Sequence, residues 1–236
     1  VAIWFAVFSI PTFLFVKEDS KPTFNINQIL TKSFIQLKDT IGHIRQYKEI
    51  TKFLLARLIY NDGLITVFAF GGIYAAGTFD FTMTEIMFFA IILNITAGLG
   101  AFSMGFLDDI IGGKMTIQIS NVGLIIACSI AVLSPNKDLF IMPIPLVGDV
   151  MITGKIMFWM AGVLIGIFSG PNQASSRSLM ARLVPNEKVN EFFGFFAFSG
   201  KATAFLGPLF LGYLTQIFGS QRFGVAVVLI FLIIGT

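Results

Sequence analysis

Long apolar runs separated by short polar stretches dominate the chain. A helix needs about 20 mostly apolar residues to cross a hydrocarbon core of about 30 Å, because each residue rises about 1.5 Å. Five runs meet or nearly meet that length, at residues 53–78, 84–107, 115–134, 156–175 and 192–218. We interpret the flanking runs 1–16 and 222–236 as incomplete spans. Runs of this length predict helices and not the short strands of a membrane barrel.

The composition also indicates a chain that lies mainly in a membrane. The chain is 56% hydrophobic and only 12% charged, whereas soluble domains carry about 25% charged residues. The apolar surface is therefore expected to face lipid, and the predicted fold class is all-α, a polytopic membrane helical bundle. One cysteine, Cys128, and one histidine, His43, exclude a disulfide framework and a Cys/His metal cluster, so no cofactor is expected. The basic residues are scattered over connecting segments, which argues against nucleic-acid binding.

Orientation follows from the distribution of Lys and Arg, which favour cytoplasmic connections. One set of alternate connections holds most of them, and the other set holds Lys137, Lys155 and Arg222. We therefore place the first set in the cytoplasm: Lys17, Lys21, Lys32, Lys38, Arg45, Lys48, Lys52, Lys114, Arg177, Arg182 and Lys188.

Two connecting segments have a pattern of their own. Residues 17–52 carry apolar positions spaced by threes and fours, from Ile26 to Tyr47, which predicts an amphipathic helix on the cytoplasmic side. A linker between two bundles is the favoured interpretation, with a regulatory element as the alternative. Residues 139–154 are apolar but contain Pro143 and Pro145, and we expect an external hairpin or loop.

Small residues recur every fourth position in two of the spans. They are Gly162, Gly166 and Gly170 in one span, and Ala97, Ala101 and Gly105 in another. Such stripes let helix backbones approach closely in lipid, so they predict packing surfaces, either static or sliding. The pairs Gly170-Pro171 and Gly207-Pro208 predict kinks.

Polar residues inside the spans are the candidates for function, because a charge near the bilayer centre is costly and usually faces a cavity or a partner. Asp62, with Asn61 beside it, and Lys201 are expected at similar depth and form a candidate charge pair across the bundle. The pair would line a substrate route and take part in ion or proton coupling; the alternative is a structural salt bridge. Arg57 is a further candidate, or a residue that extends to the cytoplasmic interface.

A second group of candidates lies in the 156–175 span and just beyond it. Gln173 and Arg177 are one turn apart and share a face near the cytoplasmic end, with Asn172 deeper in the span. They would bind a substrate carboxylate or form an inner gate, whereas simple anchoring is the alternative for Arg177. Tyr60, which precedes Asn61, completes the set of substrate-binding or coupling candidates.

The loop from Gly105 to Lys114 resembles the loop pattern of the major facilitator superfamily, Gly-x-Leu-Ala/Ser-Asp-Arg/Lys-x-Gly-Arg/Lys-Arg/Lys. Gly105, Leu107, Asp109, Gly112 and Lys114 match it, and the resemblance implies a cytoplasmic gating loop formed by these positions. The departures are Asp108 in place of a small residue, and Ile110 and Gly113 in place of basic residues.

A narrower resemblance covers nearly the whole chain. The segments Phe53–Gly63, Gln173–Leu179, Glu191–Phe195 and Ser199–Lys201 look like the vacuole-effluxer-like family of that superfamily. The resemblance implies two six-helix bundles, with residues 1–16 as the end of span 6, residues 17–52 as the interbundle loop and residues 53–236 as spans 7–12. It also implies an N-terminal bundle of the same protein as partner, and export of amino acids or related metabolites.

We therefore expect a secondary active transporter that works by alternating access on a small-molecule substrate, with a coupling proton or ion, in the bacterial cytoplasmic membrane. The alternative is a non-transporting sensor or scaffold with the same bundle. An intramembrane enzyme is disfavoured because the sequence has no His-Glu-x-x-His motif, nucleophile elbow or metal-ligand cluster.

Overall fold

The structure is a computed structural model that describes residues 2–15, 35, 42, 44–135, 140–144 and 148–236. The chain divides into two units, Val1–Gln46 and Tyr47–Thr236. In the first unit, helix α1 (Ala2–Phe15) carries exposed apolar side chains and contains Pro11. The amphipathic helix expected within 17–52 falls mostly outside the described residues.

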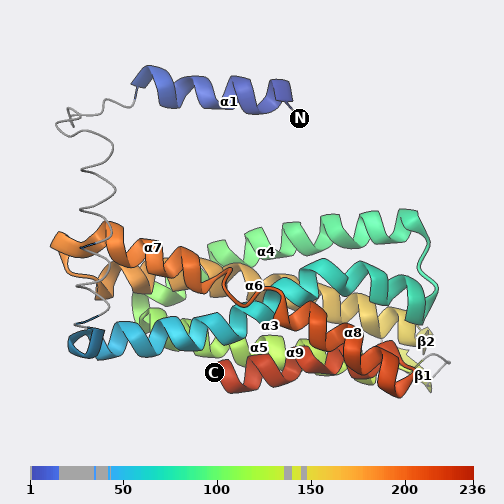
Figure 1. Ribbon diagram of the computed structural model, residues 1–236. Helices are drawn as coiled ribbons and strands as arrows, with labels where there is room; N and C mark the ends of the chain where they lie inside the picture. The colour runs from blue at the N-terminus through green and yellow to red at the C-terminus, as the bar shows by residue number, and fades with distance from the viewer. Residues whose placement is uncertain (1, 16–34, 36–41, 43, 136–139, 145–147) are drawn as a thin grey trace. The chain divides into compact units, whose positions relative to one another are not determined.

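The second unit is a bundle of helices (Figure 1). The unit begins at Tyr47, the last residue of the short 3-10 helix η1 (Ile44–Tyr47). Helix α3 (Lys48–Phe79) follows directly. The remaining helices are α4 (Met83–Ile111), α5 (Gly113–Leu133), α6 (Gly154–Leu183), η2 (Asn186–Lys188), α7 (Val189–Ser199), α8 (Leu206–Phe218) and α9 (Gln221–Gly235).

The prediction of an all-α membrane bundle is confirmed, apart from one short hairpin. Four of its helices, α3, α4, α5 and α6, are long and apolar enough to cross a membrane. Strands β1 (Phe140–Ile144) and β2 (Gly148–Ile152) pair antiparallel, as expected for a hairpin within 139–154. The run 192–218 is not one helix, because it is divided into α7 and α8 by residues 200–205.

The helix ends of α3 and α4 follow from local chemistry. Asp80 closes α3 in the left-handed conformation, with φ of 54°, and its N–H donates to the carbonyl of Ala75. Thr82 and Glu85 then form a capping box, in which the Thr82 hydroxyl accepts from the Glu85 N–H and the Glu85 carboxylate accepts from the Thr82 N–H. The tight α3–α4 turn is therefore encoded by these residues.

Helices α4 and α6 approach closely where both carry small residues. A side chain at Gly170 would collide with the carbonyl of Ala97, and one at Gly166 would lie 2.7 Å from the carbonyl of Leu93. The predicted packing role is confirmed for these positions. Gly105 is different, because a side chain there would meet no atom within 4 Å. Of the two positions where we expected kinks, Gly170-Pro171 lies inside the continuous helix α6, and Gly207-Pro208 lies in the first turn of α8.

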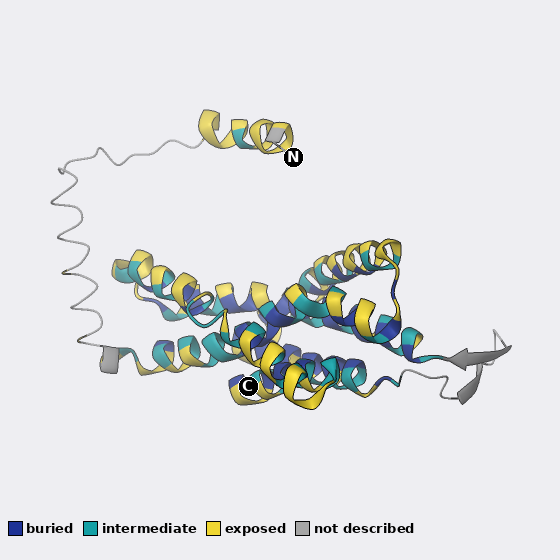
Figure 2. Cartoon of the chain, turned by 45° about the vertical axis from the view of Figure 1, so that its right-hand side comes forward, coloured by how far each residue is buried: buried dark blue, intermediate teal, exposed yellow. Residues whose placement is uncertain are grey.

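The core lies between α3, α5, α6 and α9, and α4 contributes Phe89 and Leu93 to it. At one end it is a cluster of aromatic rings in which Phe158 stacks on Phe79 and Phe89, with centroid separations of 4.9 and 5.1 Å. Helix α4, in contrast, presents an exposed apolar stripe, and Figure 2 shows this face uncovered. An exposed stripe of this length is suited to lipid or to another membrane domain. Its residues are Met87, Ile91, Ile95, Leu99, Phe102 and Phe106.

Candidate functional site

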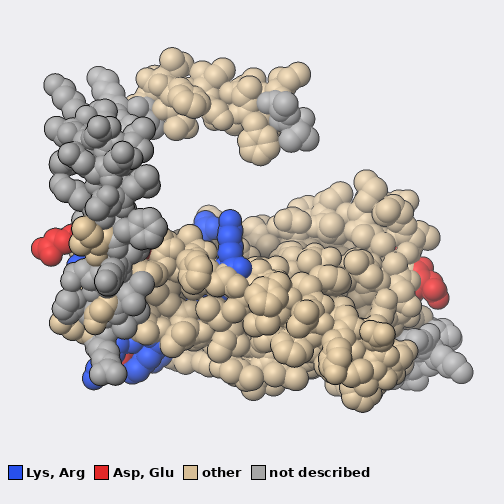
Figure 3. All heavy atoms as spheres, viewed as in Figure 1, with Lys and Arg blue, Asp and Glu red and all other residues tan. Residues whose placement is uncertain are grey.

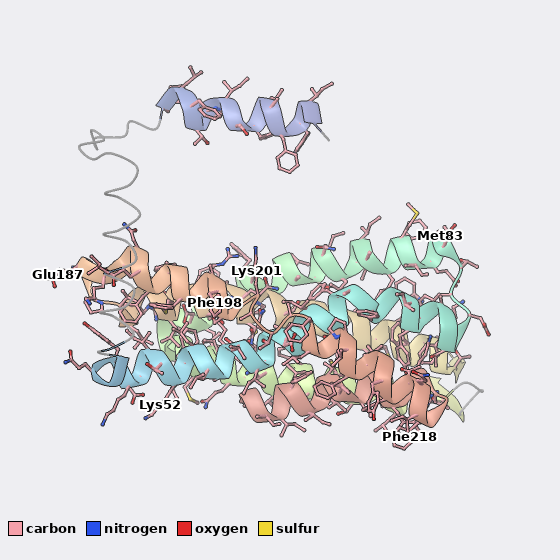
Figure 4. The ribbon with its side chains drawn as sticks, viewed as in Figure 1. Lys52, Met83, Glu187, Phe198, Lys201 and Phe218 are labelled. Atoms are coloured by element: carbon pink, nitrogen blue, oxygen red, sulfur yellow. The ribbon has the colours of Figure 1, made fainter. Side chains whose placement is uncertain are left out.

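The interruption between α7 and α8 is the feature around which several candidate residues gather. Residues 200–205 form turns, with the Leu206 N–H donating to the carbonyl of Thr203 at 2.7 Å. Lys201 lies in this interruption (Figure 4). Breaks of this kind are common where membrane transporters bind ions and substrates, because they free backbone groups inside the bundle.

Helix α3 holds the interruption in place through two donors. Arg57 Nη1 donates to the carbonyl of Phe196 at 2.7 Å and to Ser199 Oγ at 3.0 Å, and its guanidinium lies 3.6 Å above the Phe196 ring. Asn61 Nδ2 donates to the carbonyl of Gly200 at 2.9 Å. The Phe196 carbonyl also accepts from the Gly200 N–H and from Ser199 Oγ, so Arg57 adds a charged donor to the C-terminal end of α7, where the helix dipole favours a cation. Arg57 and Asn61 therefore position the break.

A cavity of about 660 Å³ opens beside this contact, between α3, α6 and α7. Five of the eight predicted substrate-binding or coupling residues line it: Arg57, Asn61, Gln173, Arg177 and Lys201. Its other lining residues are apolar or small, and none of the described lining residues is acidic. Basic side chains interrupt an otherwise uncharged face near the break (Figure 3).

The predicted charge pair between Asp62 and Lys201 is wrong. Asp62 is buried, 2% exposed, and does not line the cavity that Lys201 lines. No ion pair joins the two among the described residues. The physical reason is helical periodicity: Asn61 and Asp62 are neighbours in α3 and therefore point about 100° apart. Asn61 lines the cavity, whereas Asp62 is buried in the adjacent packing surface.

Tyr60 and Asn172 belong to a buried network instead of the cavity. The Tyr60 hydroxyl lies 2.8 Å from Ser176 Oγ, which donates to the carbonyl of Asn172 at 2.5 Å. Asn172 Nδ2 donates to Asn121 Oδ1 at 2.7 Å. The network links α3, α6 and α5 and thereby fixes their relative positions, although Asn172 Oδ1 has no hydrogen-bond partner among the described residues.

The residues predicted to form a gating loop lie at the junction of α4 and α5. Gly105 is in the last two turns of α4, Gly112 separates the two helices with φ of 85°, and exposed Lys114 lies in the first turn of α5. Arg182, at the end of α6, reaches both acids of the loop. Its Nη2 lies 3.1 Å from Asp108 and 3.6 Å from Asp109, whose side chains are 9% and 78% exposed. Asp108, a departure from the superfamily pattern, is thus the buried partner.

Sequence reasoning missed Asn121, Ser176 and Arg182. Asn121 had a usable signal, because it is an amide within the apolar run 115–134, the criterion that selected Asn172. Arg182 had been assigned only to cytoplasmic charge. In the described part of the chain, no group of three or more His, Cys, Asp or Glu residues has the proximity needed to hold a metal ion.

Comparison with known proteins gives a consistent result. The family model described as "Vacuole effluxer Atg22 like" matches residues 1–236. An uncharacterized MFS-type transporter, YxiO, from Bacillus subtilis (strain 168) is 28% identical over 99% of this chain and 50% of its own length. Autophagy-related protein 22 from Kluyveromyces lactis is 24% identical over 99% of this chain and 48% of its own length.

The chain thus spans about half the length of these curated relatives. No solved structure gives a significant match. With a family model that matches from the first residue to the last, and with helices suited to an integral, multi-pass membrane protein, the chain belongs to the vacuole effluxer Atg22-like family.

Proposed function

We propose that the chain is part of a secondary active transporter that moves a small carboxylate-bearing solute across a membrane, with amino acids and related metabolites as the first candidates. The observation that carries the proposal is the cavity beside the α7–α8 break, where Arg57, Arg177 and Lys201 converge without an acidic lining residue. A cluster of like charges is unfavourable unless an anion joins it.

The three cations have different roles in this proposal. Arg57 is already engaged by α7, and it is close enough to Arg177 for the two positive charges to repel. The side chains of Arg177 and Lys201 have no hydrogen bond or ion pair within the described residues, so they are available to a ligand. Guanidinium groups bind carboxylates in a two-point geometry, which favours Arg177 as the main contact.

The transport cycle is proposed from the family. The superfamily resemblance implies two bundles about a central site, and the exposed stripe of α4 offers a surface for an N-terminal bundle of the same protein. We propose residues 1–16 as the end of span 6, 17–52 as the interbundle loop, and Gly105, Asp109, Gly112 and Lys114 as the loop that closes the cytoplasmic side. Likeness to the Bacillus subtilis relative supports a bacterial cytoplasmic membrane.

Counterflow in proteoliposomes tests the proposal with the full-length gene product. A panel of labelled amino acids and simple carboxylates identifies the substrate class, and Arg177→Gln and Lys201→Gln are then compared with the wild type. Each lost charge-assisted contact is worth about 1.5–3 kcal/mol, so apparent affinity is expected to fall about 10- to 100-fold. Lys52→Gln is the matched control, since Lys52 is exposed and paired with Glu49 at 2.9 Å.

Two results would count against the proposal. Unchanged affinity in both cavity variants would remove the cations from substrate binding. A correctly inserted protein without flux of any tested solute would favour the alternative, a non-transporting sensor or scaffold in which these charges are purely structural.

A further inference from the structure

The carboxyl group of Asp62 is the buried group that the proposed substrate site does not use. Asp62 is 2% exposed, and neither of its carboxyl oxygens has a hydrogen-bond partner in the part of the chain that the structure describes. Next to it, Gly63 packs against Val228, Phe231 and Leu232 of α9. A charged carboxylate in such surroundings is strongly disfavoured relative to the neutral acid.

The N-terminal end of α8 lies against the same turn of α3. Gly207, in the first turn of α8, approaches so closely that a side chain there would collide with Thr66 and lie 3.3 Å from the carbonyl of Asp62. Helix α8 has no side-chain cap, and Pro208 has no N–H to offer. The backbone amide of Gly207 is the helix-terminal group that approaches the Asp62 carboxyl. The amides of Leu206 and Leu209 donate to the carbonyls of Thr203 and Phe205, so the Gly207 amide and the helix dipole are the features that would favour a negative charge at this point once water arrives.

None of the ionisable groups in the described structure forms an ion pair or hydrogen bond with the Asp62 carboxyl. On α3, Arg57 donates to α7 and Tyr60 contacts Ser176. On the other elements, Lys201 and Arg177 line the cavity, and Arg222, at the far end of α9, donates to the carbonyls of Val132 and Ser134. The remaining groups on α4, α6 and α8 are Glu85, Asp108, Asp109, Lys155, Arg182 and Tyr213, and none forms an ion pair or hydrogen bond with Asp62 in the described structure.

We propose that Asp62 is a proton-binding site: its carboxyl group is neutral while α8 packs against α3, and it releases the proton to water when the α7–α8 break moves away. The O–H bond of the acid breaks, the electron pair stays on the carboxylate, and the proton leaves to the side from which water enters. This inference rests on the proposed transport function, which it deepens by assigning a residue to proton coupling.

A proton fits this position better than a metal cation. Sodium and other hard cations need several oxygen ligands around them. Here the nearby hydroxyl, Thr66 Oγ1, donates to the carbonyl of Asp62 at 2.8 Å, and the helix behind it presents aliphatic and aromatic side chains. A proton needs one carboxyl group and a route to water. The break beside Gly200 and Lys201 supplies that route, because it borders the large cavity.

Infrared difference spectroscopy of the full-length gene product, with aspartate labelled at the side-chain carboxyl carbon, tests the site directly. Wild type is expected to show a protonated-aspartate band that disappears as pH rises. The band is expected to be absent in Asp62→Asn and Asp62→Glu, and retained in Asp80→Asn. Asp80 is the matched control, because it ends the same helix and is exposed. Asp62→Glu keeps a carboxyl group and covers the case in which Asp62→Asn fails to insert.

Transport measurements on the same preparations separate the two proposals. Asp62→Asn is expected to retain counterflow but to lose accumulation driven by a pH gradient, at least about tenfold below wild type. A titrating band with no transport of any solute would leave the proton site standing and refute the transporter. A wild-type band that persists in Asp62→Glu, or spectra that respond to Na⁺ and not to pH, would overturn the proton site.

Discussion

Asp108 and Asp109 can be compared directly as partners of Arg182. Asp109 matches the superfamily loop pattern, whereas in the structure Asp108 is the acid that is buried and closer to Arg182. Arg182 Nη2 donates to Asp108 Oδ2 at 3.1 Å, and the Asp108 side chain is only 9% exposed. The contact to Asp109 is 3.6 Å, and that side chain is 78% exposed. We therefore expect Asp108→Asn to weaken the α4–α6 connection and Asp109→Asn to leave it nearly intact.

The magnitude follows from burial. A hydrogen bond between charged groups contributes about 1.5–3 kcal/mol when it is shielded from water. Because the Arg182 side chain is 46% exposed, we expect about 1–2 kcal/mol for Asp108→Asn, against about 0–0.5 kcal/mol for the exposed pair. At about 2–4 °C per kcal/mol, the melting temperature is expected to fall by about 2–8 °C in the first variant and by less than about 2 °C in the second.

Thermal unfolding of the full-length gene product in detergent measures both effects. Combining each variant with Arg182→Gln isolates the two pairwise energies, and the Asp108–Arg182 coupling is expected to exceed the Asp109–Arg182 coupling. Equal losses from Asp108→Asn and Asp109→Asn would refute the reasoning, because burial would then have no bearing on which acid holds the arginine.

Three further predictions concern packing and caps. Gly170→Val is expected to lower the free energy of unfolding by about 1–3 kcal/mol, because its side chain would collide with the backbone of Ala97. Gly98→Ala, where a side chain would lie in open space, is expected to be tolerated. Thermal unfolding measures both. Tyr60→Phe removes the contact with Ser176 and is expected to cost about 1 kcal/mol by the same assay. Glu85→Gln weakens the pair with Lys155 at 2.6 Å. Because exposed ion pairs contribute little, the melting temperature is expected to change only slightly, and a fall as large as that of Asp108→Asn would contradict this.

The amino-acid pattern alone was sufficient for the membrane-bundle fold. Apolar runs long enough to cross a bilayer predicted α3, α4, α5 and α6 to within a few residues of most of their ends. This succeeds because each helix in lipid must satisfy its own backbone hydrogen bonds, so length and hydropathy determine the element without reference to its neighbours. The small residues Gly166 and Gly170 likewise predicted a packing surface, which the structure places against α4.

The tertiary structure decided which polar residues share a site. The sequence pattern placed Asn61 and Asp62 in the same candidate site and paired Asp62 with Lys201. Adjacent residues of a helix point in different directions, however, and only the packing of α7, α8 and α9 shows which groups surround each side chain. The predicted kink at Gly207-Pro208 pointed to this region, but the position and extent of the break at residues 200–205 were not predicted, since the apolar run continues through it. Hydropathy indicates whether a segment lies in lipid or in water. A binding site depends instead on how the helices are rotated and how closely they pack, and this is determined by contacts between residues far apart in the sequence.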